Sequence, residues 1–326
     1  MSYRIFLEDV ATPYNTNALG NAKAWEVRNL RNDSSLPPVM YVVESATSQR
    51  FLLGRGISGR TKFNLLRHMS KSFIELFYEQ LRGKELSQYL ILKGAYPLDL
   101  QPEIGLVPPY DVSLLPTGFV KLQRVLNWEG TDWEIHGQNL VGEYQGDTWL
   151  IPEAAVASGS TIAFFLRNGF VSHTPKQVYV FTACGSLEGI QRIYRECEKA
   201  GVELIPVFCQ CIFEVSKTGN LPNLPLTDLS VLSPGSITAR EFYHKASDRY
   251  QGKRMCSVGD IRTSFEDPLQ YSLYTLWEMQ TLGMDPQKED WDAWNLDIRG
   301  KKFQKKVQDF NPELFEYFRE IWKEEK

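Results

Sequence analysis

The sequence predicts an α/β protein built on a parallel sheet with a Rossmann-like order of strands and helices. Three apolar strand-like runs, 149–151, 178–182 and 204–208, alternate with two segments of helical character. Alternation of this kind is typical of parallel strands joined by right-handed crossovers. Ligands in such sheets bind beyond the carboxyl ends of the strands, so the turns that follow these runs are the first places to look for a site.

The N-terminal part predicts two strands and one long helix. Residues 39–43 and 50–53 are strand-like runs, whereas the first 35 or so residues have the composition of loops. Helical spacing of Phe63, Leu66, Phe73 and Phe77 predicts a helix over 61–81 whose apolar stripe packs in the core. A strand at 89–92 follows and leads directly into Lys93 and Gly94.

The middle of the chain contains the least regular pattern. Residues 102–147 mix Pro, Gly and Trp without a clear period, which predicts a functional loop or flap. After strand 149–151 we expect a short helix that Gly169 ends. The next helix starts at about Leu187, with Ser186 as its N-cap and Gly201 at its C-terminal end.

We expect two parts, an α/β domain over 1–265 and a helical C-terminal extension over 266–326. Asp267-Pro268, Asp285-Pro286 and Asn311-Pro312 each combine an N-cap residue with a proline at the first helical position, which predicts three helix starts. The aromatic residues of this extension are expected to dock on the main domain or on a partner subunit, and a homodimer is expected.

The bulk properties indicate a cytoplasmic protein. The chain has 326 residues and a net charge of −4, so its overall charge favours neither nucleic acid nor an anionic membrane. Its N-terminus lacks the pattern of a signal peptide, and no apolar run is long enough for a membrane span. Five Cys without a CxxC pair and four scattered His predict no metal site built by the protein alone.

One segment has the pattern of an anion site. The strand that ends at Glu153 is followed by the small residues Ala157 to Thr161 and then by a helix. Backbone N–H groups of such a loop, together with the positive end of the helix dipole, favour a phosphate. Ser158, Ser160 and Thr161 can add hydroxyl donors. The simpler interpretation is that a Ser or Thr only caps the helix.

Four segments in consistent order resemble the type I phosphoribosyltransferase family, and most of all its uracil group. Residues 153–161 resemble the phosphoribosyl pyrophosphate loop, which reads Asp-Pro-Met-Leu-Ala-Thr-Gly-Gly-Ser in the uracil enzymes. Residues 92–96 resemble the pyrophosphate loop, and residues 257–265 resemble the base-binding segment. Arg60, Thr61 and Phe63, at the start of the long helix, resemble a segment near the N-terminus of the uracil enzymes. Leu187-Glu188-Gly189-Ile190 adds a weaker match to their Pro-Glu-Gly-Ile.

The resemblance implies a pentosyltransferase that moves ribose 5-phosphate from phosphoribosyl pyrophosphate to a nucleobase, with a uracil-like pyrimidine favoured. It implies that Ala157, Ser158, Gly159, Ser160 and Thr161 bind the 5′-phosphate. Mg²⁺ would accompany the substrate as cofactor. Glu153 would orient the ribose, and Lys93 and Gly94 would bind pyrophosphate. Lys121 or Arg124 would reach the leaving group. Val258, Gly259 and Asp260 would bind the base.

Some positions depart from the family pattern. Glu153-Ala154 stands where most members have two adjacent acids or Asp-Pro, and the base-binding segment is shortened to Gly259-Asp260. The alternative is therefore a regulatory protein that binds a nucleotide or phosphoribosyl pyrophosphate without catalysis, because a fold does not imply an activity.

Overall fold

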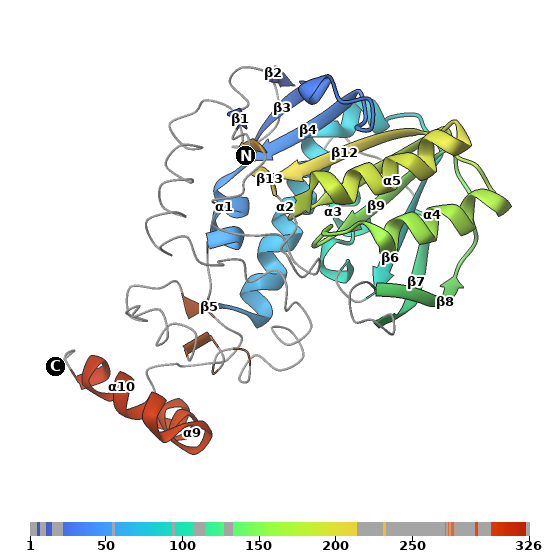
Figure 1. Cartoon of the computed structure of the whole chain (residues 1–326). Helices are drawn as coiled ribbons and strands as arrows, with labels where there is room; N and C mark the ends of the chain where they lie inside the picture. The colour runs from blue at the N-terminus through green and yellow to red at the C-terminus, as the bar shows by residue number, and fades with distance from the viewer. Residues whose placement is uncertain are drawn as a thin grey trace.

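A nine-stranded, mostly parallel sheet lies at the centre of the computed structural model (Figure 1). Strands β4, β12, β10, β9, β6 and β7 run parallel, β2 and β3 add an antiparallel hairpin at one edge, and β8 pairs antiparallel with β7 at the other. In sheet order the strands are β2 (Ala11–Tyr14), β3 (Lys23–Arg28), β4 (Val39–Glu44), β12 (Glu203–Cys209), β10 (Gln177–Thr182), β9 (Thr148–Glu153), β6 (Leu86–Leu92), β7 (Thr117–Leu126) and β8 (Trp133–Val141).

The structure describes part of the chain, and the statements below concern that part. The described residues are 5–6, 11–14, 22–53, 56–92, 95–106, 115–126, 133–213, 231–232, 271, 273, 275–276, 291–292 and 301–323.

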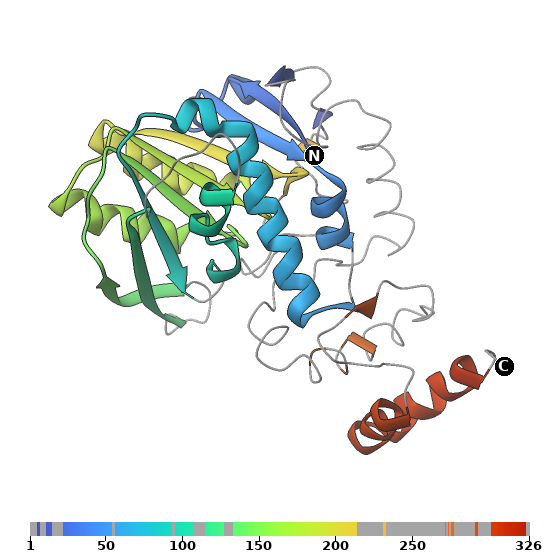
Figure 2. The same ribbon diagram turned by 180° about the vertical axis from the view of Figure 1, so that it is seen from behind.

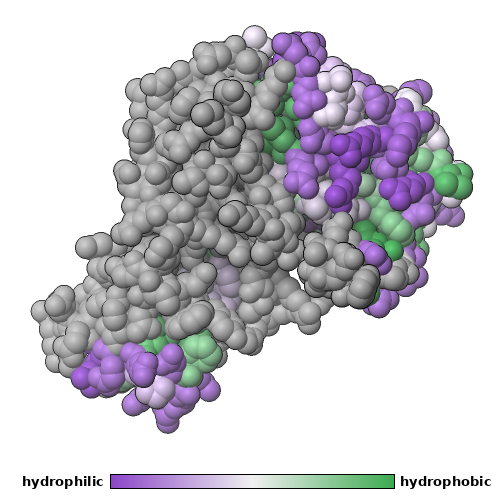
Figure 3. All heavy atoms as spheres, in the orientation of Figure 1, coloured by the Kyte–Doolittle hydropathy of each residue, from purple (hydrophilic) through white to green (hydrophobic). Residues whose placement is uncertain are grey.

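Helices cover both faces of the sheet. Helix α2 lies on one face and is seen in front in Figure 2, whereas α4 and α5 lie on the opposite face, in front in Figure 1. Figure 3 shows a mainly hydrophilic surface over α4 and α5, as expected for helices that turn one side to water. The helices are α1 (Ala46–Leu53), α2 (Gly59–Leu81), α3 (Gln101–Leu106), α4 (Ser160–Ser172), α5 (Leu187–Ala200), α9 (Lys301–Phe310) and α10 (Pro312–Lys323), with 3-10 turns at Leu30–Asn32 and Tyr96–Leu98.

The alternation of side chains along each strand creates two cores. Along β10, Tyr179 and Phe181 belong to the core under α2, whereas Val178 and Val180 belong to the core under α4 and α5. Successive residues of a strand point to opposite faces, so each central strand contributes to both layers. This burial on both faces explains why the parallel strands read as continuous apolar runs in the sequence.

Two small sheets lie outside the main one. The first contains β1 (Ile5–Phe6), β14 (Val231–Leu232), β13 (Cys211–Phe213) and β11 (Gly185–Ser186). Its strand β11 lies directly before α5, and β13 follows β12 after Gln210, which has a positive φ of 68°. The second sheet pairs β5 (Gly56–Ile57) with β15 (Trp291–Asp292).

The structure confirms the α/β fold, the parallel order, the long helix and the strands that precede Lys93 and Glu153. The helix start at Asn311 is also confirmed, because its Oδ1 accepts hydrogen bonds from the backbone N–H groups of Glu313 and Leu314. Described residues at 271, 273 and 275–276 are helical, as expected after Asp267-Pro268. The helix start at Asp285-Pro286 lies outside the described residues.

Three local predictions were wrong. Residues 50–53 belong to α1, because Ser45 and Ser48 exchange hydrogen bonds that start a helix instead of a strand. The loop-rich start contains the hairpin of β2 and β3. Gly169 does not end α4 but lies inside it, where a Cβ would come within 2.9 Å of the rings of Trp149 and Tyr144.

The segment that lacked a clear pattern is largely regular. Strands β7 and β8 form a long hairpin within 102–147, with an irregular register between Gln123 and Arg124. An edge hairpin exposes much of both strands, so its hydrophobic pattern is weak in the sequence. Trp291–Asp292 is likewise a strand in the part predicted to be helical.

Candidate anion-binding site

The loop from Ala154 to Gly159 connects the carboxyl end of β9 to the start of α4. Strand β9 lies between β10 and β6, and Glu153 is in register with Thr182 of β10. The loop therefore lies at the middle of the edge where parallel strands end. This is the edge at which sheets of this kind bind ligands.

Helix α4 begins without a side-chain cap. Its N-cap residue is Gly159, in the left-handed region at φ 68°, and within the described structure no side chain accepts a hydrogen bond there. The first helical hydrogen bond runs from Ala163 N to Gly159 O at 2.9 Å, and the first turn has no acidic residue. The N–H groups of the first turn therefore have the orientation and the dipole that bind an anion.

The hydroxyls of this loop contact each other instead of the helix amides. Ser158 Oγ and Ser160 Oγ lie 3.0 Å apart, and both residues are half-buried. Thr161, also half-buried, follows in the first turn. The simple capping interpretation predicts a Ser or Thr hydroxyl that accepts from a first-turn N–H, and this arrangement is absent from the described α4 terminus.

The start of α5 fixes the path of the loop. Val156 N donates to Cys184 O at 2.8 Å, and Ser186 N donates to Val156 O at 2.9 Å. Gly159 also lies against α5, where a Cβ would overlap the carbonyl oxygen of Gly189. Only glycine tolerates both this close approach and the positive φ, so this position of the loop requires glycine.

Glu153 contacts its own loop. Its Oε1 accepts a hydrogen bond from Ala154 N at 2.9 Å, and its backbone oxygen accepts from Ala183 N at 3.2 Å. The side chain is half-buried at the edge of the sheet. Its position at the end of β9 agrees with the position expected from the sequence, whereas its role toward a ribose stays a prediction.

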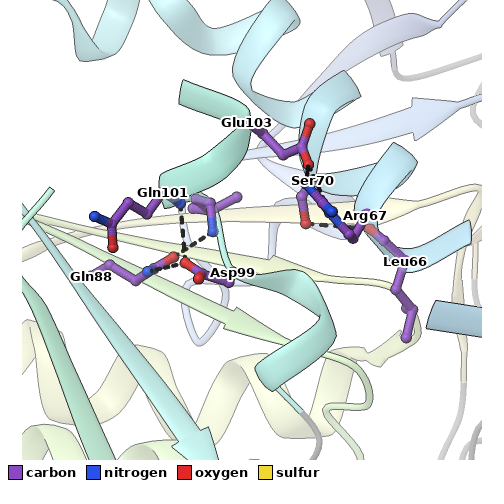
Figure 4. Close-up of polar contacts among 8 residues, drawn as sticks. Leu66, Arg67, Ser70, Gln88, Asp99, Gln101 and Glu103 are labelled. Carbon is purple, nitrogen blue, oxygen red and sulfur yellow. Dashed lines mark hydrogen bonds and ion pairs between the residues drawn. The ribbon is translucent and has the colours of Figure 1, made fainter. Parts of the chain in front are cut away.

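Lys93 and Gly94 lie outside the described residues, but their flanks are described. Strand β6, which ends at Leu92, pairs parallel with β9, so both strands end at the same edge. On the other flank, Gln88 holds the segment that begins at Ala95: its Nε2 donates to Asp99 Oδ1 at 2.7 Å and its Oε1 accepts from Leu100 N at 2.7 Å (Figure 4). Figure 4 also shows the contact of Arg67 in α2 with Glu103 in α3, 2.8 Å between Nη2 and Oε1.

The other predicted residues are less well located. Arg124 belongs to β7, and its side chain is not among those described. Val258, Gly259 and Asp260 lie outside the described residues. The structure thus brings together Glu153 and the loop Ala157 to Thr161, with β6 as their neighbour.

Three cysteine side chains among the described residues are buried. Cys184, Cys197 and Cys209 form no disulfide, and burial raises the pKa of the Cys197 and Cys209 thiols. A thiol with a raised pKa is a poor nucleophile at neutral pH. Within the described ranges, no three His, Cys, Asp or Glu side chains gather as metal ligands, and no helix has the length and apolar character to span a bilayer.

Sequence reasoning places Ser186 near this site, but it missed the contact of Ser186 with Ala157 and the close approach of Gly189 to the same loop. Ser186 was predicted as a cap of α5, which the structure confirms with Gly189 N donating to its Oγ at 2.9 Å. The same Oγ also donates to Ala157 O. Residues Ala157 to Thr161, which include the start of α4, are called the anion loop below. The match of Leu187-Glu188-Gly189-Ile190 to the family was the signal that could have drawn attention to this contact.

The chain matches no protein-family model and no curated protein in sequence. Several solved structures similar to it are phosphoribosyltransferases. A protein from Aquifex aeolicus is 18% identical with a TM-score of 0.40, over 53% of this chain and 88% of that one. A hypoxanthine phosphoribosyltransferase from Staphylococcus aureus is 19% identical with a TM-score of 0.27, over 36% of this chain and 61% of that one.

A third similar structure is adenine phosphoribosyl transferase from Trypanosoma brucei in complex with AMP, pyrophosphate and ribose-5-phosphate. It is 8% identical with a TM-score of 0.34, over 52% of this chain and 83% of that one. Likeness at these values assigns no activity to the chain.

Proposed function

We propose that the loop Ala157 to Thr161 binds a phosphate group, and that the chain transfers ribose 5-phosphate from phosphoribosyl pyrophosphate to a nucleobase. The observation that carries the proposal is the start of α4. Its first turn has no side-chain cap, its N-cap is a left-handed Gly159, and the Ser158 and Ser160 hydroxyls lie 3.0 Å apart beside it. A dianionic phosphate satisfies such a terminus better than water does.

In the proposed reaction, the protein has to orient the substrates and to stabilise the charges that develop on them. Glycosyl transfer passes through a cationic, oxocarbenium-like state, so catalysis rests on orienting the ribose and stabilising the leaving pyrophosphate. Glu153, at the end of β9, would orient the ribose. Lys93 and Gly94, which follow β6, would bind pyrophosphate with help from Arg124, while Val258, Gly259 and Asp260 would border a uracil-like base.

Mg²⁺ would enter with the substrate. The Glu153 carboxylate is the type of hard oxygen donor that this ion prefers, and Mg²⁺ commonly keeps most of its ligands from water and substrate phosphates. The one carboxylate that Glu153 provides therefore fits a metal–substrate complex in which the substrate supplies most of the other ligands. When bound, the ion would neutralise charge that develops on the leaving pyrophosphate.

A second candidate is a protein that binds phosphoribosyl pyrophosphate without transferring its ribose. The observation that favours it concerns Glu153, whose Oε1 accepts from Ala154 N and which is followed by Ala154 instead of a second acid. The Glu153 carboxylate already accepts a hydrogen bond from its own loop, so it offers fewer contacts to a ribose than the two adjacent acids of the family pattern. The phosphate half of the site is the same in both candidates.

Binding and turnover separate these candidates. We expect phosphoribosyl pyrophosphate with Mg²⁺ to raise the melting temperature, because a ligand that binds the native state stabilises it by mass action. Addition of uracil should then release pyrophosphate. Tight binding with no release across nucleobases would favour the second candidate, and no binding with or without Mg²⁺ would contradict both.

The first and last residues of α4 provide a matched pair of variants. Ser160→Ala should weaken binding roughly tenfold, the effect of one hydrogen bond to a charged group. Ser172→Ala removes an exposed hydroxyl at the other end of the same helix and should leave affinity unchanged. Equal affinities of the two variants would show that the Ser160 hydroxyl does not contact the ligand.

A further inference from the structure

Ser186 lies between the anion loop and helix α5, and its hydroxyl serves both. It is fully buried, its Oγ accepts from Gly189 N at 2.9 Å, and the same Oγ donates to Ala157 O. Its backbone N–H donates to Val156 O at 2.9 Å. One residue thus caps α5 and contacts two successive residues of the loop before α4.

The contact with Ala157 fixes the direction of a peptide plane. The Ala157 oxygen points toward the first turn of α5, where it also lies against Gly189 so closely that a Cβ there would overlap it. In a trans peptide, the carbonyl and the following N–H point to opposite sides. The N–H of Ser158 is therefore directed away from α5.

The opposite orientation of the Ala157–Ser158 peptide would weaken anion binding. If the Ala157 carbonyl turned outward, its partial negative charge would face the ligand, and the Ser158 N–H would be lost to it. Anion-binding loops depend on successive N–H groups that converge on one point. Ser186 and Gly189 together prevent the outward orientation, one by donating a hydrogen bond and the other by leaving room for the oxygen.

We infer that Ser186 is a positioning residue for a phosphomonoester bound at the start of α4. It holds the Ala157 carbonyl toward α5, so that the Ser158 N–H and the first-turn N–H groups of α4 face the same phosphate. This inference rests on the proposed function and deepens it. Ser186 does not touch the phosphate itself.

A residue that only caps α5 would behave differently in three variants. Ser186→Ala removes both hydrogen bonds, whereas Ser186→Thr keeps a hydroxyl that can accept and donate. Asn311→Ala removes the cap of α10, where Oδ1 accepts from two N–H groups, and leaves the anion loop intact. It is the control for the loss of a cap alone.

The decisive measurement is the affinity for ribose 5-phosphate by calorimetry, with each variant checked for its melting temperature. Ser186→Ala should bind roughly tenfold more weakly, which corresponds to one lost hydrogen bond to a charged group. Ser186→Thr should restore the affinity, and Asn311→Ala should match the unsubstituted protein.

A second measurement needs no ligand. The ¹⁵N shift of an amide depends on hydrogen bonding at the preceding carbonyl, so the Ser158 amide signal should move in Ser186→Ala and not in Ser186→Thr. If the unsubstituted protein binds ribose 5-phosphate, and Ser186→Ala binds it equally with an unmoved Ser158 signal, the positioning role is wrong and the proposed function stands. If the unsubstituted protein does not bind, the proposed function fails, and the ligand role of Ser186 fails with it.

Discussion

Helices α4 and α5 lie side by side on one face of the sheet, yet they begin in opposite ways. Helix α5 is capped by Ser186, has Glu188 in its first turn and ends at a left-handed Gly201. Helix α4 begins at a left-handed Gly159, and its first turn has neither a side-chain cap nor an acid. Both follow central parallel strands, so their place in the fold does not explain the difference.

Under the proposed function, this difference separates a helix terminus that is stabilised by its own cap from one that binds a ligand. Unsatisfied N–H groups at a helix start destabilise a protein, and a cap removes part of that cost. Helix α5 satisfies its terminus with its own residues. Helix α4 has no such cap, and under the proposed function a bound phosphate would satisfy its terminus, while the cap of α5 contacts the α4 loop through Ala157. The capped start of α5 thus supports the loop that is proposed to bind phosphate.

Gly159→Ala should have the largest effect. The left-handed conformation costs a non-glycine residue about 1 to 2 kcal/mol, and overlap with the Gly189 carbonyl adds about 1 to 3 kcal/mol through backbone shifts. The control is Gly201→Ala, which has the same φ of 68° but no atom within 4 Å of its added Cβ. Chemical denaturation and phosphate binding should both show a greater loss for Gly159→Ala. Equal losses would mean that the contact between the two helix starts has no importance.

Ser160→Asp should give α4 the acid that α5 already has. A carboxylate in the first turn stabilises a helix by about 0.3 to 1 kcal/mol, so the ligand-free protein should become more stable. The same charge should repel phosphate and weaken binding by at least roughly tenfold, from about 1.4 kcal/mol of repulsion between like charges at close range. If Ser160→Asp makes the ligand-free protein more stable and also weakens phosphate binding, then the start of α4 is a site where an anion binds.

The matched control is Ser172→Asp at the last residue of α4. A negative charge at the C-terminal end opposes the dipole, so this variant should be slightly less stable and should bind phosphate normally. Thermal melts with and without ribose 5-phosphate measure both quantities. If Ser160→Asp neither stabilises the protein nor weakens binding, the start of α4 is not an anion site.

The parts of this comparison that depend on local residue types could be predicted from the sequence. The β9 strand, the small residues after it, the Ser186 cap and the Gly201 end each depend on neighbours in the chain. The contact of Ser186 with Ala157 spans 29 residues and arises only when β9 and β10 pair. No local pattern contains it.

Contacts between residues distant in the chain also account for the predictions that were wrong. Gly169 reads as a helix end, because glycine is common there, but its place inside α4 is decided by the rings of Trp149 and Tyr144. The β7–β8 hairpin is an edge element whose exposed residues, such as Val141, obscure the alternation of a strand. The structure at these positions depends on residues that are distant in the chain, and one sequence does not show which distant residues come into contact.

The smallest effect concerns the ion pair that joins the two helices along their length. Arg167 of α4 donates to Glu196 of α5, with 2.9 Å between Nη2 and Oε1, and Lys199 lies 3.3 Å from the same oxygen. The hydrogen bond from Arg167 holds the pKa of the Glu196 carboxyl below its ordinary value of 4.5. The Arg167 side chain is 62% exposed, so water screens the pair, and Arg167→Met should cost at most about 1 kcal/mol.

The pH dependence of the stability lost in Arg167→Met tests whether the ion pair between α4 and α5 accounts for that loss. Because the folded pKa of Glu196 is depressed, the stabilisation is fully present above the ordinary value of 4.5 and disappears as the pH falls through the lower folded value. Denaturation at pH 7 should therefore distinguish Arg167→Met from the unsubstituted protein, whereas the difference should shrink in acid. In Glu196→Gln, the arginine substitution should have little further effect at either pH. Phosphate affinity should not change in any of these variants, since backbone contacts among Val156, Ser186 and Gly189 fix the loop. A loss of affinity in Arg167→Met would mean that the alignment of the two helices, and not the cap of α5, positions the α4 terminus.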